Sequence, residues 1–226
     1  MTQTNIKQIL DSLNTLQEQL MSLQDDMLLS IDPRDNDSID KGAALMKAFN
    51  NNMHQFAVSA NSIAEQIKTQ FGINPEDDDL EQESANRSKR ERIIKELDKS
   101  QAFSLKDDFT YKRPYGFVLD DVAIKGIKTW KSMYIQILNF VYEKDPVRFQ
   151  LITKEQDFIS KRGLKLYDHT GENFRVAVKI PGGLFAEMNM SANTIRNVMF
   201  DLLKFFSIDP LKMKVYLRED RDATEQ

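Results

Sequence analysis

The stretch VKIPGGLFAEMNMSANTIRNVMFDLLKFF, residues 178–206, decides the fold class of the second half of the chain. Its first half has short apolar segments on both sides of Pro-Gly-Gly, a pattern typical of two strands joined by a turn. Its second half carries apolar residues at helical spacing, namely Ile195, Val198, Met199, Leu202, Leu203 and Phe206. A strand pair that leads into an amphipathic helix predicts an α+β domain with a small antiparallel sheet.

The junction between this strand and helix is polar and has two interpretations. Ser191 or Asn193 is expected to cap the helix, because a side-chain oxygen there accepts a free backbone N–H. A helix N-terminus also attracts phosphate, and the side chains of Asn189, Asn193 and Arg196 can pair with base edges. Together with Thr194, these residues form one part of a candidate binding site.

The remainder of residues 103–218 supplies the core of the same domain. This region holds the single tryptophan and all six tyrosines. Strands are expected within residues 115–127, 163–170, 174–180, 183–190 and 213–219, and helices within 129–145 and from Pro146. The segment SKRGLKLY contributes Lys161, Arg162, Lys165 and Tyr167 as the second part of the candidate site.

Residues 1–73 predict a helical hairpin. The first helix has apolar residues spaced alternately by three and four, as in a coiled-coil heptad; they are Ile6, Ile9, Leu13, Leu16, Leu20, Leu23 and Met27. Pro33 breaks this helix. The second helix, from about Ser38 to Phe71, has an expected stripe of Ile39, Leu45, Phe49, Met53, Phe56, Ala60, Ile63, Ile67 and Phe71.

A lone hairpin buries little surface, so a second copy of the chain is expected to complete a bundle. This predicts a homodimer formed through residues 1–73. The alternative is a hairpin that packs on its own C-terminal domain.

Charge is distributed unevenly along the chain. Residues 1–102 hold 11 Lys and Arg against 18 Asp and Glu, whereas residues 103–218 hold 19 against 13. Residues 74–102 are expected to be a charged linker with a short helix near Arg90 to Leu97, and residues 219–226 an acidic tail. The basic surplus of residues 103–218 indicates a polyanion as a possible partner.

Composition excludes several kinds of chemistry. The chain has no cysteine and only two histidines, His54 and His169, so thiol catalysis and Cys-based metal sites are excluded. It has no G-x-G-x-x-G, Walker A or G-x-S-x-G motif. We therefore expect a protein that is not an enzyme and needs no cofactor or metal.

Hydropathy predicts a cytoplasmic protein without a membrane partner. No apolar run approaches the roughly 20 residues of a membrane helix. The N-terminal residues also lack the basic start and unbroken apolar segment of a signal peptide.

From about Lys128 to Asp209, the order of elements resembles the C-terminal domain of the SeqA family, replication modulators that bind hemimethylated GATC sites in DNA. In this resemblance Lys165 takes the place of a loop arginine, and Asn189 that of a base-reading asparagine. Gly163 and Leu164 depart from the family's Arg-Thr pair, and the second asparagine is matched loosely by Ser191 or Asn193. The resemblance implies binding to double-stranded DNA by the two polar segments.

The expected function is that of a dimeric, nucleoid-associated DNA-binding protein. Its expected role is either regulatory or the sensing of DNA modification. One alternative is a protein-interaction adaptor that uses the helical hairpin and does not bind DNA. A third is a subunit of a nuclease or defence complex.

Overall fold

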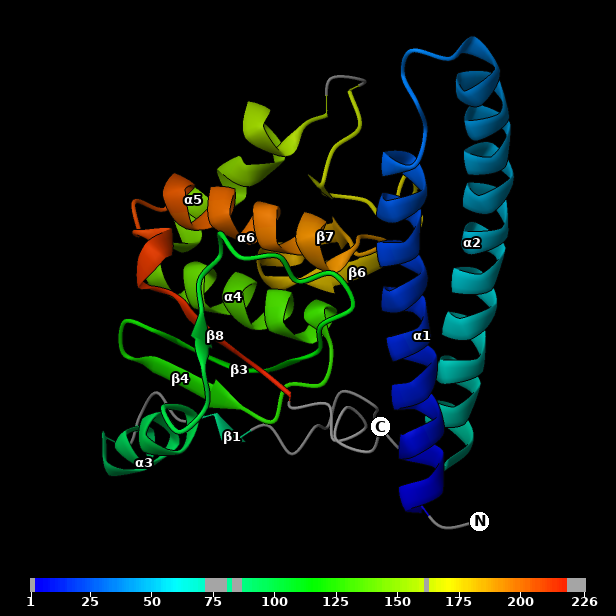
Figure 1. Cartoon of the computed structure of the whole chain (residues 1–226). Coiled ribbons are helices and arrows are strands. Elements are labelled where there is room, and N and C mark those ends of the chain that lie inside the picture. Colours follow the sequence, from blue (N-terminus) through cyan, green and yellow to red (C-terminus); the bar gives the residue numbers. More distant parts are fainter. Residues whose placement is uncertain (1–2, 72–80, 83–86, 161–162, 219–226) are drawn as a thin grey trace.

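The computed structural model describes residues 3–71, 81–82, 87–160 and 163–218 (Figure 1). The helices are α1 (Gln3–Leu29), α2 (Asn36–Phe71), α3 (Arg87–Leu97), α4 (Trp130–Lys144), α5 (Pro146–Phe149) and α6 (Ala192–Phe205). The strands are β1 (Glu81–Gln82), β2 (Ala102–Phe103), β3 (Pro114–Leu119), β4 (Val122–Lys125), β5 (Tyr167–Asp168), β6 (Ala177–Ile180), β7 (Leu184–Glu187) and β8 (Lys214–Leu217). The acidic tail and residues 74–80 and 83–86 of the expected linker lie outside the described residues.

The second half of the chain forms an α+β domain, as its sequence predicts. It contains two antiparallel sheets, one with the strand order β1-β4-β3-β8-β2 and one with the order β5-β7-β6. The turn between β6 and β7 is Pro181–Gly183, where Gly182 and Gly183 have φ of 72° and 76°. Glycine adopts this left-handed conformation without a steric penalty, which explains the Pro-Gly-Gly sequence. In the described part of the chain, no helix is long and apolar enough to cross a membrane.

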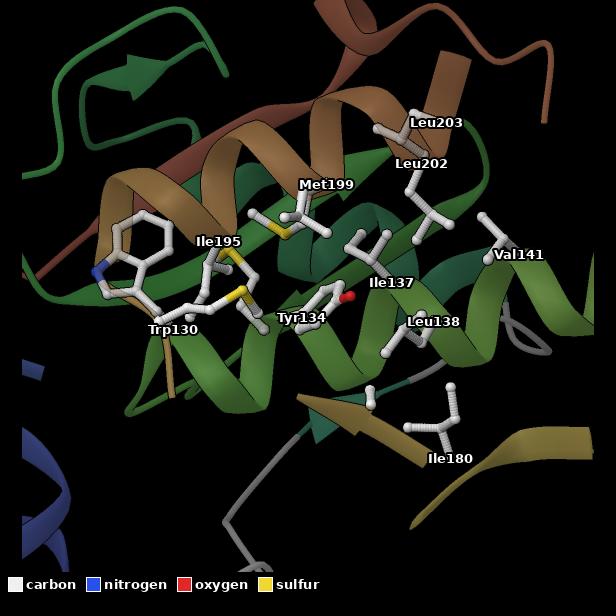
Figure 2. Close-up of a cluster of buried hydrophobic side chains, with 14 of the residues drawn as sticks. Trp130, Tyr134, Ile137, Leu138, Val141, Ile180, Ile195, Met199, Leu202 and Leu203 are labelled. Atoms are coloured by element: carbon white, nitrogen blue, oxygen red, sulfur yellow. The ribbon is translucent and has the colours of Figure 1, made fainter. Parts of the chain in front are cut away.

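The core of this domain lies where α4 packs on α6. Figure 2 shows side chains of the two helices pointing toward one another, and Leu138 of α4 pointing toward Ile180 of β6. Trp130 and Tyr134 are fully buried here. Thr129 caps α4 by accepting a hydrogen bond from the Ser132 N–H at 3.0 Å, so periodicity and capping both set the helix start.

Helix α3 belongs to this domain rather than to a solvated linker. Ile93 and Leu97 are almost completely buried against Ala123 of β4 and Tyr216 of β8. The Tyr216 hydroxyl donates a hydrogen bond to Asp98 at 2.6 Å. The expected helix near residues 90–97 is therefore present, and it covers one face of the larger sheet.

The hairpin of α1 and α2 forms, but its seam differs from the predicted heptad by one residue. On α1, Ile6 and Leu10 are buried against Ala64 and Ile67 of α2. The seam on α1 thus steps by four residues from Ile6 to Leu10, where the predicted heptad steps by three from Ile6 to Ile9. Leu10 therefore takes the inward position that was predicted for Ile9. The predicted inward residues Ile9, Leu16 and Leu23 are exposed instead, by 47, 45 and 39%.

The α2 side of the seam is built from small residues. Met53, Ala57 and Ala60 are buried, and Ala64 follows at the same spacing. Met53, Ala60 and Ile67 of the predicted stripe therefore belong to the seam, whereas its other members do not. Four members of that stripe or its ends are exposed: Ile39, Leu45, Ile63 and Phe71.

Helix α1 packs on the α+β domain of its own chain, the arrangement left open as the alternative to dimerisation. Figure 1 shows α1 lying between α2 and the domain. Asp11 of α1 forms an ion pair with Lys128 at 3.3 Å. Asp26 of α1 accepts a hydrogen bond from the Tyr111 hydroxyl at 2.5 Å. Polar residues of α1 therefore contribute to this contact, and so does the buried Met21, which lines a cavity with Met188 and Met190 of the domain.

Candidate functional site

The polar junction before α6 is first of all a helix cap. Ser191 is buried, and its Oγ accepts a hydrogen bond from the Thr194 N–H at 3.3 Å. Its hydroxyl also lies 3.0 Å from the Thr194 hydroxyl. The expected cap is thus confirmed, with Ser191 rather than Asn193 in that position.

Asn193 holds a distant loop in place. Its Oδ1 accepts a hydrogen bond from the Phe109 N–H at 2.9 Å. Its Nδ2 donates to Asp108 Oδ1 at 2.6 Å and to Thr110 Oγ1 at 2.8 Å. The amide and the Thr110 hydroxyl hold the pKa of Asp108 below its usual range, because their hydrogen bonds favour the carboxylate.

Arg196 anchors the same loop from the next turn of α6. Its guanidinium donates to the Asp107 carbonyl oxygen at 2.6 Å and to Asn197 Oδ1 at 2.9 Å. The loop then continues into Tyr111, which bonds to α1 and has a positive φ of 56°. Asn193 and Arg196 therefore have partners within the chain, and those partners lie in the loop that reaches the hairpin.

Asn189 does not offer its whole amide to solvent, as a base-reading residue would. Its Oδ1 is buried without a hydrogen-bond partner, and its backbone N–H donates to Glu187 Oε1 at 2.8 Å. The expectation that both amide atoms point outward is therefore wrong for Oδ1.

The second polar segment is only partly described. Lys161 and Arg162 lie outside the described residues. Lys165 is exposed, and its Nζ donates to Asp168 Oδ2 at 3.3 Å. Tyr167 is fully buried, and its hydroxyl is hydrogen-bonded to that of Tyr134. The expectation that Tyr167 is a surface binding residue is therefore wrong. Burial raises the pKa of Tyr167 well above its ordinary value.

The two candidate segments emerge from the same end of one strand pair. The Glu187 N–H donates to the Leu166 carbonyl oxygen at 3.0 Å, directly after the pairing of β5 with β7. This places the backbone after Glu187 beside the backbone before Leu166. Of the candidate residues that the structure describes, Lys165 and Thr194 are the exposed ones.

The hairpin carries a second candidate surface. It consists of apolar residues that the heptad and stripe patterns predicted to be buried. Each residue turns a helix by about 100°, so a residue three positions after a seam residue lies about 60° to one side of the seam. Such residues form one flank of each helix. In an antiparallel pair these two flanks meet on the same side. We call this side the outer face, formed by Ile9, Leu16, Leu23, Leu45, Phe49, Phe56 and Ile63.

The outer face is apolar and accessible. Five of its seven side chains are 39 to 56% exposed, and the two phenylalanines are half-buried. Helical geometry places uncharged side chains between them, namely Ser12, Gln19, Asn52 and Ser59. The charged residues of α1 that touch the domain, such as Asp11, lie on another side of that helix.

Two further observations bear on function. Within the described ranges, no group of three His, Asp or Glu side chains is placed to hold a metal ion. Comparisons with family models, curated proteins and solved structures found no match to this chain. The resemblance to the SeqA family therefore stays a hypothesis that rests on the residues quoted for it.

Proposed function

We propose that the chain is a non-enzymatic interaction protein that forms a dimer through the outer face of its hairpin. The observation that carries this proposal is the exposure of Ile9, Leu16, Leu23, Leu45 and Ile63 on one uncharged face. Contiguous exposed apolar surface of this kind marks interaction sites in proteins. The intramolecular packing of α1 leaves this face uncovered by any described residue.

The size of the face suits a second copy of the chain. A helix of 27 residues, such as α1, is about 40 Å long, and two adjacent helices span about 20 Å. The resulting area of about 800 Å² per partner is that of a standard stable interface. Two such hairpins packed face to face make a four-helix bundle, and the absence of charge means that identical faces do not repel one another.

Light scattering on the full chain tests this proposal. The wild type is expected to have the mass of two chains at micromolar concentration, and Leu16→Lys and Ile63→Lys that of one. A buried lysine ammonium in the interface would be strongly unfavourable. Val58→Lys is the matched control, because Val58 is 52% exposed on α2 but lies off the outer face.

A monomeric wild type at high micromolar concentration would overturn the dimer. The outer face would then be the binding site for a helix of another protein, as in the adaptor function. Equal masses for the wild type and all three variants would exclude the outer face as the contact.

DNA binding by residues 103–218 is a second candidate function. It is supported by the surplus of six positive charges in that region and by the exposure of Lys165. With three to five phosphate contacts, log K should fall with log salt at about −0.9 per contact. Lys165→Ala is expected to weaken binding to all duplexes alike, as loss of a phosphate contact does.

The control for this second candidate is Lys154→Ala, an exposed lysine outside both polar segments. Titration of duplexes with methylated, hemimethylated and unmethylated GATC would also detect a preference for modified DNA. An absence of binding to any duplex at low salt would remove this candidate and leave the interaction proposal unaffected.

A further inference from the structure

A carboxyl group of α1 caps a helix of the α+β domain. Glu18 Oε1 accepts a hydrogen bond from the Trp130 N–H at 2.6 Å and from the Lys131 N–H at 3.3 Å. These are two of the first N–H groups of α4, which have no partner within their own helix. The cap of α4 is therefore shared between its own Thr129 and a residue more than one hundred positions earlier in the chain.

The geometry of this cap can also be met by a neutral carboxylic acid. Both N–H donors reach the same oxygen, Oε1, which a protonated carboxyl group still offers as its carbonyl oxygen. Replacement of the carboxylate by a neutral amide would likewise keep an acceptor at this position. The cap thus does not by itself require the negative charge.

Glu18 lies at the contact between α1 and the domain. It borders a cavity of about 30 Å³, whose other walls include Met21 of α1 and Met188, Met190 and Ile195 of the domain. Burial raises the pKa of Glu18 from 4.5 to about 7.

The charged groups that face Glu18 act in the opposite direction but do not outweigh its burial. Lys131 of α4 and Arg113, which precedes β3, both lower the pKa of Glu18. The nearest described acid on α1 with a partner in the domain, Asp11, is paired with Lys128. The hydrogen bonds from the two backbone N–H groups also favour the carboxylate, and they too are smaller than the effect of burial.

We propose that docking of the hairpin onto the α+β domain takes up a proton at Glu18, so that α1 is held more tightly in mildly acid than in mildly alkaline solution. Release of α1 would uncover the methionine-lined surface beside α6 and break the link from Asp26 to Tyr111. This inference does not depend on the dimer, because Glu18 lies on the side of α1 that faces the domain.

The direction of the pH effect follows from linkage. A carboxyl group with a pKa of 4.5 when released and about 7 when docked binds more protons in the docked state. The extra stability is fully present below pH 4.5 and is lost as the pH rises through 7. The docking equilibrium constant should fall about tenfold between pH 6 and pH 8, given these two pKa values.

Amide hydrogen exchange of the intact protein tests the proposal. After correction for intrinsic exchange rates, protection of the Trp130 and Lys131 amides should fall about tenfold from pH 6 to pH 8. Glu18→Gln should remove this pH dependence. Asp11→Asn is the matched control: it should lower protection at every pH, because it loses the contact with Lys128, yet keep the tenfold change.

Two results would overturn the proposal. One is equal pH dependence of protection in the wild type and Glu18→Gln. The other needs no variant: carbon NMR of the wild-type Glu18 carboxyl should show a titration midpoint near pH 7, and a midpoint near 4.5 would exclude proton uptake on docking.

Discussion

Asn193 illustrates how one polar side chain connects three parts of the molecule. It sits in the first turn of α6, and its amide makes three hydrogen bonds to residues 108–110. The next residue of that loop, Tyr111, bonds to Asp26 of α1. The polarity of the junction therefore serves the position of the loop and, through it, the hairpin.

Asn193→Ala should destabilise the fold, whereas Asn189→Ala should not. Loss of the Asn193 amide leaves the partly buried Phe109 N–H and two side chains without a partner, which costs about 1–3 kcal/mol in the free energy of unfolding. Asn189 Oδ1 is buried with no partner, so its removal should change that free energy by less than about 0.5 kcal/mol. Urea unfolding monitored by Trp130 fluorescence measures both.

A comparable loss of stability in both variants would contradict this reading of the junction. If Asn189→Ala is neutral to folding but weakens binding to DNA, the SeqA-like role of Asn189 gains direct support.

At the scale of elements, the seam residues of α2, alanines among them, determine which side of α1 faces inward. Ala57 is completely buried, and Ala60 almost so. Short side chains let two helices approach closely, and the larger Met53 and Ile67 fill the seam on either side of these alanines. Other large apolar side chains of the two helices, such as Leu16 and Leu45, lie on the outer face.

Ala57 also belongs to the buried cluster of the α+β domain, so Ala57→Leu should disturb the packing of α2 on its neighbours. Three extra carbon atoms in a packed seam typically destabilise a fold by about 1–3 kcal/mol. Val58→Leu, at the adjacent exposed position, adds apolar volume without entering the seam and should be nearly neutral. Thermal unfolding of both variants checks this, and equal midpoints for the two would show that the seam is not closely packed at Ala57.

At the scale of the whole molecule, the hairpin has two sides with different chemistry. The side facing the domain combines the buried Met21 with the polar residues Asp11, Glu18 and Asp26, which are bonded to domain residues. The outer face is apolar and uncovered. This division suits a hairpin that is docked on its own domain and also pairs with another copy.

Dimer formation predicts that thermal stability depends on protein concentration. Association that involves only the folded state raises the unfolding midpoint by mass action, so the midpoint should increase over a hundredfold range of concentration. Leu16→Lys should abolish this increase. The unfolding midpoint of the variant should equal that of the dilute wild type at every concentration. A midpoint independent of concentration in the wild type would mean that the dimer is not the stable form.

The amino-acid sequence by itself determined most of the elements of this protein and their class, but not the short strands β1 and β2. Periodicity and end signals located both hairpin helices, α4, α6 and the strands β3 and β4, and capping chemistry identified Ser191 as one of two candidates. These features depend on residues close together in the chain, whose backbone preferences do not require knowledge of distant partners. The α+β class follows from them directly.

Only the tertiary structure decided which side of each element is buried. On α1, the stripes through Ile9 and through Leu10 differ by one residue, and packing against Ala64 and Ile67 of α2 selects the second. Glu18 and Asn193 are residue types that often face solvent or bind ligands. In the structure they instead bond to Trp130 and Phe109, which lie far away in the chain. A polar side chain is assigned by the donor or acceptor that the fold brings to it, and that pairing is absent from local sequence.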